Sequence, residues 1–373
     1  MKIGLLIFPL HYSHGNILQT YALYSKLKEL GHDVTILDRQ PNRQSTAKWY
    51  LAVLKRMARW AFKGYRGAIF YKGWFPKKIM EEQQPFIDSF KSDIISIWSS
   101  GELRQIVVKE KFNAIVVGSD QTWRPCYVPN VMDYWLYFAS DIPVMKVAYA
   151  PSFGVDIWEY SEFQTETCKK LAALFDGISV REESGVHLCK EKLGVEVKHV
   201  LDPTMLWDKT FYIPIAQKCK IQSGGCQCYF LDRSSEKEAV ASKIAEIKGL
   251  SINYVNTKTE DADASIKERI TPGIEKWLAG FLNGDFIVVD SFHAMVFSII
   301  FQKPFIVIGN QYRGLTRFES FLRQLDLMDR LMTEGGDFEE IIKKDIDWIS
   351  VNKLLNNHRI TSINFLKSSL NHK

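Results

Sequence analysis

The stretch FIVVDSFH, residues 286–293, decides the fold, because an apolar run passes directly into a polar quartet. Uninterrupted apolar runs are typical of parallel strands that helices cover on both faces. An apolar segment, 296–301, follows at once and is the predicted start of the next helix. Parallel sheets bind ligands at the carboxyl ends of their strands, and the first turn of a helix favours an anion. The stretch therefore predicts an α/β sheet with a candidate site at residues 290–293.

Alternating strands and helices extend this pattern over the first half of the chain. Gly15 precedes a predicted helix, 17–30, which Gly31 ends. Asp202-Pro203 indicates a turn that closes the series. The predicted strands are 3–8, 34–37, 114–117, 146–150, 177–180 and 197–201, and further helices are predicted at 163–175 and 183–193.

A second series begins near residue 210. Its predicted strands are 228–231, 252–255, 286–289 and 304–308, and its predicted helices are 236–247, 274–282, 318–325 and 351–370. Two successive series predict two Rossmann-like domains, 1–205 and 206–373, that face a cleft. We expect the final helix to pack back on the first domain.

The composition is that of a globular protein large enough for two cores. Of its 373 residues, 46% are hydrophobic and 24% are charged. We expect no signal peptide, and no apolar run approaches the length of a membrane span. Cys226 and Cys228 are the closest pair among six cysteines, without a C-x-x-C motif, and we expect reduced thiols rather than metal ligands. These features predict a cytoplasmic protein with no metal and no cofactor.

The net charge is +5, and residues 43–78 carry much of the excess. As a helix, 49–63 has an apolar arc opposite a basic one. The apolar arc holds Tyr50, Leu51, Val53, Leu54, Met57 and Trp60, and the basic arc holds Lys48, Lys55, Arg56, Arg59 and Lys63. This pattern predicts peripheral contact with an anionic membrane through 48–63, or packing on its own domain or on a second subunit. No nucleic-acid motif accompanies the charge, so nucleic acid is not an expected partner.

The first polar segment is SHGNILQ, residues 13–19, between the first strand and the first helix. Gly15 can bring backbone amides close to a phosphate or a sugar hydroxyl, or can simply permit the turn. Asn16 and Gln19 are candidate ligands of an acceptor sugar. The three-glycine spacing of a dinucleotide site is absent, which argues against NAD.

The second polar segment is VGSDQTW, residues 117–123, at the end of a predicted strand. Ser119, Asp120 and Gln121 are candidates for binding acceptor hydroxyls. Trp123 offers a face on which a sugar can stack. The alternative is that Asp120 only caps a helix or turn.

Two further segments combine basic residues with a histidine. Arg181 follows a predicted strand and can form a bidentate pair with carboxylate or phosphate, or a surface salt bridge with a neighbouring glutamate. His293 is a candidate proton donor near neutral pH, and we expect Asp290 to orient it. Arg313 and Arg317 follow the strand 304–308 and add positive charge. The alternative is a histidine that only donates structural hydrogen bonds.

Taken together, these segments resemble the polysaccharide pyruvyl transferase family. The matching motifs occur in order: the turn 15–19 with YAL (21–23), GSDQ (118–121), YAPSFG (149–154), SVRE (179–182), LDPT (201–204), DSFH (290–293), and RG (313–314) with Arg317. The resemblance implies a glycosyltransferase-B-like fold. It also implies transfer of the enolpyruvyl carbons of phosphoenolpyruvate to a sugar of a cell-surface polysaccharide or its lipid-linked precursor, as a ketal.

The resemblance assigns roles to individual residues. Arg181 matches the family's strand-end arginine, His293 the histidine of its Asp-x-Phe-His motif, and Arg313 a downstream arginine. It implies that Arg181 and Arg313 bind the carboxylate and phosphate of phosphoenolpyruvate, with Arg317 and Ser291 beside them. His293 would protonate the methylene carbon. A lipid-linked acceptor would place the protein at the inner face of the cell membrane.

Three positions depart from the family pattern. Ser291 stands where many members have arginine, Ala294 where most have glycine, and Asn16 where relatives often have glycine or aspartate. The missing arginine removes a strong anion ligand, so two other hypotheses stay open. One is a sugar-nucleotide-dependent glycosyltransferase of the same fold, with Asp290 or Glu319 on the ribose. The other is a non-catalytic sugar-binding component of a polysaccharide assembly complex.

Overall fold

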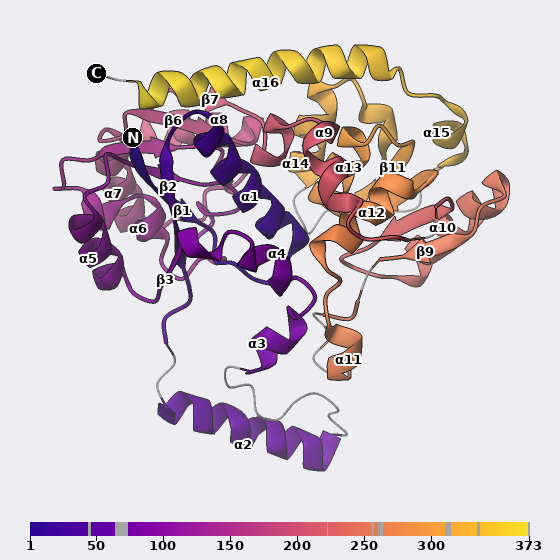
Figure 1. The fold of residues 1–373 in the computed structure, drawn as a ribbon, viewed down its shortest axis with the longest axis horizontal. Coiled ribbons are helices and arrows are strands. Elements are labelled where there is room, and N and C mark those ends of the chain that lie inside the picture. The colour runs from indigo at the N-terminus through magenta and orange to yellow at the C-terminus, as the bar shows by residue number, and fades with distance from the viewer. Residues whose placement is uncertain are drawn as a thin grey trace.

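The computed structural model describes residues 1–43, 46–63, 74–221, 223–255, 257–259, 261, 264–309, 315–333 and 336–371. Two α/β units lie side by side, each built on a parallel sheet (Figure 1). The predicted fold class is therefore confirmed.

The N-terminal sheet has the strand order β3-β2-β1-β4-β5-β6-β7, with parallel pairing between neighbours. Its strands are β1 (Lys2–Ile7), β2 (Asp33–Arg39), β3 (Ile94–Ile97), β4 (Ala114–Val117), β5 (Met145–Ala148), β6 (Gly177–Val180) and β7 (Lys198–His199). The chain builds the sheet outward in both directions from β1 and β4, which are apolar and buried. Such a switch point leaves a crevice at the carboxyl ends of the two strands.

The C-terminal sheet has the order β12-β11-β10-β8-β9 and is also parallel. Its strands are β8 (Cys226–Tyr229), β9 (Ile252–Tyr254), β10 (Phe286–Val289), β11 (Phe305–Gly309) and β12 (Leu331–Thr333). All four residues of β10 are buried, as the apolar run predicts. The strands β3 and β12 were not predicted; both are short edge strands with weaker apolar patterns.

Helices cover both sheets. The first, α1 (His14–Glu29), begins three residues before its predicted start because the side chain of Ser13 accepts a hydrogen bond from the Asn16 N–H and caps it. The other helices are α2 (Thr46–Lys63), α3 (Trp74–Ile79), α4 (Gln84–Asp88), α5 (Ser100–Glu110), α6 (Val131–Tyr134), α7 (Glu162–Ala172), α8 (Glu183–Leu188), α9 (Lys209–Ala216), α10 (Ser235–Lys248), α11 (Ile266–Arg269), α12 (Ile274–Asn283), α13 (Phe292–Ile300), α14 (Leu315–Gln324), α15 (Glu339–Lys343) and α16 (Trp348–Leu370).

The two units share one hydrophobic cluster, which joins Ile17 of α1 to Trp277 of α12. Helix α16 leaves the C-terminal unit and lies over the N-terminal one (Figure 1). There the Ser362 hydroxyl accepts a 2.9 Å hydrogen bond from the Leu201 N–H, and Arg359 donates to the Met205 carbonyl. The shared core and α16 therefore hold together the two units that border the cleft.

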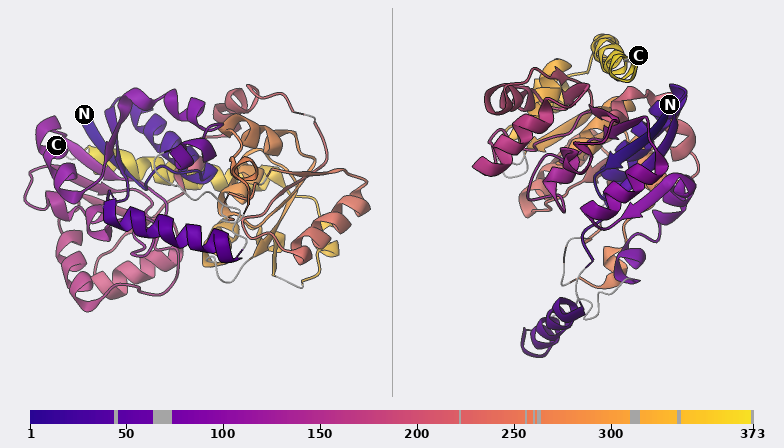
Figure 2. Two further views of the ribbon diagram at one scale, coloured as in Figure 1. Left: turned by 90° about the horizontal axis from the view of Figure 1, so that it is seen from below. Right: turned by 90° about the vertical axis from the view of Figure 1, so that its left-hand side faces the viewer.

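Helix α2 stands off the body, on the side opposite α16 (Figures 1 and 2). The flanking residues 44–45 and 64–73 lie outside the described part of the chain. None of the described helices combines the length and apolar character that crossing a bilayer requires.

Candidate active site

A cleft of about 1030 Å³ lies between the two units. One wall consists of residues that follow β1 and β4. The other consists of residues that follow β8, β9, β10 and β11, together with Trp277 of α12. Both walls are carboxyl ends of parallel strands, which is where the sequence places its candidate residues. The predicted residues that line the cleft are Gly15, Asp120, Gln121, Asp290, Ser291, His293 and Arg317.

His293 reaches across the cleft to the start of α1. Its side chain is 13% exposed. A Cβ atom built on Gly15 would lie 2.1 Å from Nδ1 of His293, so the ring occupies the space that any other residue at position 15 would need. Gly15 is in α1 and has no positive φ. Position 15 therefore requires glycine because the His293 ring approaches so closely, and not because the backbone needs a positive φ.

The carboxylate nearest the His293 ring belongs to Asp202, at 3.6 Å between Oδ2 and Nε2. Asp202 is buried and accepts hydrogen bonds from the N–H and hydroxyl of Thr204 and from Nη1 of Arg181. Burial alone would raise the pKa of Asp202, but His293 and Arg181 outweigh burial and hold that pKa well below its usual range. Asp202 is therefore a fixed negative charge behind the imidazole.

From local pattern, the sequence predicts only a turn at Asp202-Pro203. Its motif, LDPT, was among the segments that match the family, and this was the one signal that could have identified it. Its contact with His293 joins positions 91 residues apart on two units, which no local pattern reveals.

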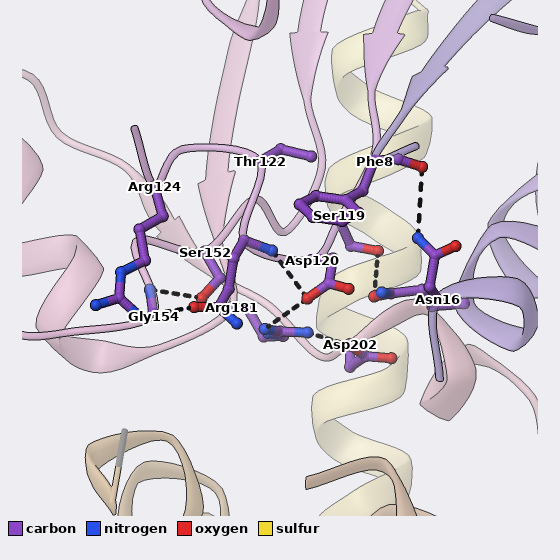
Figure 3. A network of polar contacts seen from close by, with 12 residues as sticks. Phe8, Asn16, Ser119, Asp120, Thr122, Arg124, Ser152, Gly154, Arg181 and Asp202 are labelled. Atoms are coloured by element: carbon purple, nitrogen blue, oxygen red, sulfur yellow. Dashed lines mark hydrogen bonds and ion pairs between the residues drawn. The ribbon is translucent and has the colours of Figure 1, made fainter. Parts of the chain in front are cut away.

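Arg181 lies behind the cleft wall and does not line it. It donates a 2.9 Å hydrogen bond to Asp202, and longer ion pairs of 3.7 and 3.9 Å join it to Asp120 and Glu182 (Figure 3). The ring of Phe292 covers its guanidinium at 5.0 Å. Burial would lower the pKa of Arg181, and the three carboxylates more than reverse this. In this arrangement Arg181 holds Asp202, rather than facing a donor as the sequence predicted.

Arg317 of α14 provides a cation in the cleft wall itself. Burial, and then the nearby charge of Arg181, lower the pKa of Arg317 to about 10, so it remains positive at neutral pH. Ser291 also lines the cleft, at the N-cap of α13, and its side chain makes no capping hydrogen bond there. The first N–H groups of α13 thus start at the cleft wall. Arg313 lies outside the described residues.

The predicted role of Asp290 in orienting His293 is wrong. Its carboxylate accepts hydrogen bonds from the Leu231 and Asp232 N–H groups. It also forms a 2.8 Å ion pair with Lys237. These partners come from the loop after β8 and from α10. Asp290 therefore fixes that loop beside the cleft, and the carboxylate that lies near the His293 ring is that of Asp202.

The predicted acceptor residues divide into two groups. Asp120 and Gln121 line the cleft, and Asp120 takes a positive φ of 73° while accepting a 2.9 Å hydrogen bond from the Gln121 N–H. Asn16, Gln19 and Ser119 are buried behind them: Ser119 donates to Gln19 at 2.7 Å, and Asn16 donates to the Phe8 carbonyl (Figure 3). These three therefore support the wall.

The predicted stacking face of Trp123 is wrong. The side chain is fully buried and stacks on Trp135, with ring centroids 3.9 Å apart, while Nε1 donates to the Tyr134 carbonyl. The indole is a core residue because the chain turns at Asp120 and directs it inward.

The sequence model of the polysaccharide pyruvyl transferase family matches residues 14–312 of this chain. The chain belongs to the polysaccharide pyruvyl transferase family. The match contains Arg181, Asp202 and His293 and ends one residue before Arg313. Membership in the pyruvyl transferase family marks the chain as a transferase that acts on polysaccharide. A search of curated proteins finds no match.

Solved structures with the same fold include UDP-GlcNAc 2-epimerases. The enzyme from Methanocaldococcus jannaschii has a TM-score of 0.51 at 13% identity, covering 95% of this chain and 93% of that chain. The Neisseria meningitidis enzyme, bound to UDP-GlcNAc, has a TM-score of 0.50 at 11% identity, covering 98% and 100%. They confirm the predicted glycosyltransferase-B-like architecture. At this identity they show the fold alone.

Proposed function

We propose that this pyruvyl transferase moves the enolpyruvyl carbons of phosphoenolpyruvate onto a sugar of a cell-surface polysaccharide or its lipid-linked precursor, forming a ketal. The observation that supports this most is the line His293–Asp202–Arg181, which runs from the cleft into the protein. It places an imidazole in the cleft against a carboxylate that stays charged. This arrangement supports a role for His293 as the proton donor to carbon.

In the proposed reaction, protonated His293 gives its proton to the methylene carbon of phosphoenolpyruvate. The carbon that bears the phosphate becomes electrophilic, and an acceptor hydroxyl attacks it and releases a proton. Phosphate then leaves with the electrons of its C–O bond, and a neighbouring hydroxyl attacks the same carbon and closes the ketal. Of the two hydroxyl protons, one returns to His293 and the other goes to the released phosphate. Asp202 orients the ring and stabilises its charge before transfer. The route uses only protein side chains and the donor, so we propose no metal and no cofactor.

The donor binds, in this proposal, to the part of the cleft wall that contains Arg317, Ser291 and the first N–H groups of α13. A guanidinium and a helix N-terminus both suit the carboxylate and phosphate of phosphoenolpyruvate. Arg313 remains a proposed second ligand. Asp120 and Gln121, on the opposite wall, are the proposed ligands of the acceptor hydroxyls.

The test is phosphate release from phosphoenolpyruvate with extracted lipid-linked glycans as acceptors. We expect acceptor-dependent release by the wild-type chain and its loss in His293→Ala. An acceptor preparation that a characterised pyruvyl transferase turns over serves as the positive control. Release by His293→Ala at the wild-type rate would contradict the proposed mechanism.

A nucleotide-sugar glycosyltransferase is the second candidate, because a neighbour of the same fold carries UDP-GlcNAc. It predicts turnover that needs a nucleotide sugar and is indifferent to phosphoenolpyruvate. Sugar binding without any turnover would favour a non-catalytic assembly component instead. A lipid-linked acceptor would place the reaction in the cytoplasm, at the inner face of the cell membrane.

A further inference from the structure

Helix α2 presents an apolar face on which Val53 is buried but the six larger side chains are left uncovered by the described part of the protein. Six large apolar side chains of this helix are between 46% and 87% exposed. They are Tyr50, Leu51, Leu54, Met57, Trp60 and Phe62, and we call them the apolar face of α2. Isolated exposed apolar residues are ordinary on soluble proteins, but six on one helix form a contiguous patch that indicates a binding surface.

The charge of the same insertion is strongly one-sided. Residues 43–78 contain ten lysines and arginines and no aspartate or glutamate. The rest of the chain carries 38 basic and 43 acidic residues, a net charge of −5. On α2 itself, Lys55 and Arg59 are exposed. A basic, apolar helix thus projects from an acidic body, so a negatively charged surface attracts the helix and not the body.

The position of α2 relates it to the cleft. In Figure 1 it lies on the side of α3 and α11, away from α16. The carbonyl of Ile79, at the end of α3, accepts a 2.9 Å hydrogen bond from the N–H of Thr271, which follows α11. Lys267 of α11 lines the cleft, and so does Thr271. The insertion is therefore joined to the cleft wall on the side from which α2 projects.

We propose that α2 lies flat in the interface of an anionic lipid bilayer and seats the protein there. Its 18 residues span about 27 Å, which suits a helix in the plane of the membrane. The apolar face would enter the boundary between headgroups and acyl chains, with Trp60 among the headgroups. Lys55 and Arg59, on the opposite arc, would bind lipid phosphates. A nucleic acid would bind the basic arc but leave the apolar face in water. A second copy of this chain would cover the apolar face without needing the basic arc.

The test is cosedimentation of the full chain with phosphatidylcholine vesicles, with or without phosphatidylglycerol. We expect binding to the anionic vesicles only, weakened by added salt. Each lysine or arginine near the surface contributes roughly five-fold in affinity, so Lys55→Gln/Arg59→Gln should weaken binding roughly 25-fold. Leu54→Asp/Met57→Asp should abolish it.

Matched controls lie on α16, which faces away from α2. Ile349 is 85% exposed, and Lys353 and Lys367 are exposed, so Ile349→Asp and Lys353→Gln/Lys367→Gln should leave vesicle binding unchanged. Circular dichroism verifies that every variant is folded. Because no substrate is present, the result is independent of the proposed pyruvyl transfer.

Three results would overturn the proposal. The first is equal binding by the wild type and the Lys55→Gln/Arg59→Gln variant. The second is a dimer in light scattering that Leu54→Asp/Met57→Asp dissociates, without any vesicle binding, which would assign the apolar face to a second copy. The third is RNA binding that depends on Lys55 and Arg59, again without vesicle binding.

Discussion

His14 is the first residue of α1 and His293 is the second residue of α13, but the surroundings of the two histidines differ. Nε2 of His14 donates a 2.8 Å hydrogen bond to the Pro272 carbonyl of the opposite unit, and its ring stacks on Trp277 at 5.0 Å. His14 is buried, and burial lowers its pKa to about 4, so it is neutral at neutral pH. His293 faces the cleft with Asp202 behind it.

The comparison shows which surroundings separate a structural histidine from a candidate catalytic one in this fold. The same residue type, at the same kind of helix start, joins the two units when an aromatic ring and a carbonyl enclose it. In the proposed mechanism it donates a proton where a charged carboxylate lies behind it and its ring faces the cleft. Gly15 connects the two cases, because it follows His14 and makes room for His293.

The largest expected effect separates the two histidines by function. His293→Ala should lower phosphate release roughly 10²- to 10⁴-fold, because it removes the proposed acid. Its urea unfolding midpoint should stay close to that of the wild type. His14→Ala should instead lose about 1–3 kcal/mol of unfolding free energy, since Pro272 loses its donor and Trp277 its stacking partner. The reverse pattern, an active His293→Ala and an inactive but stable His14→Ala, would exchange the two roles.

A smaller effect is expected where the two helices touch. Gly15→Ala places a methyl group where the His293 ring lies, so the ring must move, and turnover should fall roughly 10²-fold. Gly101→Ala is the matched control, because that glycine is in α5 and a Cβ there meets nothing within 4 Å. In the double variant Gly15→Ala/His293→Ala, the glycine change should cost no further activity. An additive loss would mean that Gly15 acts elsewhere.

The pH dependence of stability should distinguish the buried histidine. Its folded pKa of about 4 lies below the ordinary 6.5, so the unfolded chain binds more protons between these values. The stabilisation is complete above about pH 6.5 and is lost as the pH falls towards 4. Between pH 7 and pH 5, wild-type unfolding free energy should fall by about 2 kcal/mol more than that of His14→Gln, measured in urea. If the unfolding free energies of the two proteins changed in parallel with pH, His14 would have an ordinary pKa in the folded protein.

The sequence predicts the framework of the site better than its contacts. Apolar runs such as β10 identify the parallel strands, and their ends place His293 and Arg317 at the cleft. Local pattern does not reveal whether a polar side chain turns towards the cleft or away from it. Arg181 turns away because Asp202 and two further carboxylates surround it, and Trp123 turns away because a second indole lies beneath it. Such choices depend on residues distant in sequence.

Asp202→Asn tests the feature that distinguishes His293 most directly, and its expected effect is the smallest. The amide keeps the shape of the carboxylate but removes the charge behind the ring. The 3.6 Å separation is long for a hydrogen bond, and such contacts tighten when substrate binds. A hydrogen bond to a charged group contributes about 1.5 kcal/mol, so turnover should fall roughly ten-fold. Thr204→Val removes a different partner of Asp202 and leaves the charge, so its turnover should stay close to the wild-type rate. An equal fall in turnover in both variants would reduce Asp202 to a structural residue, and His293 would then resemble His14.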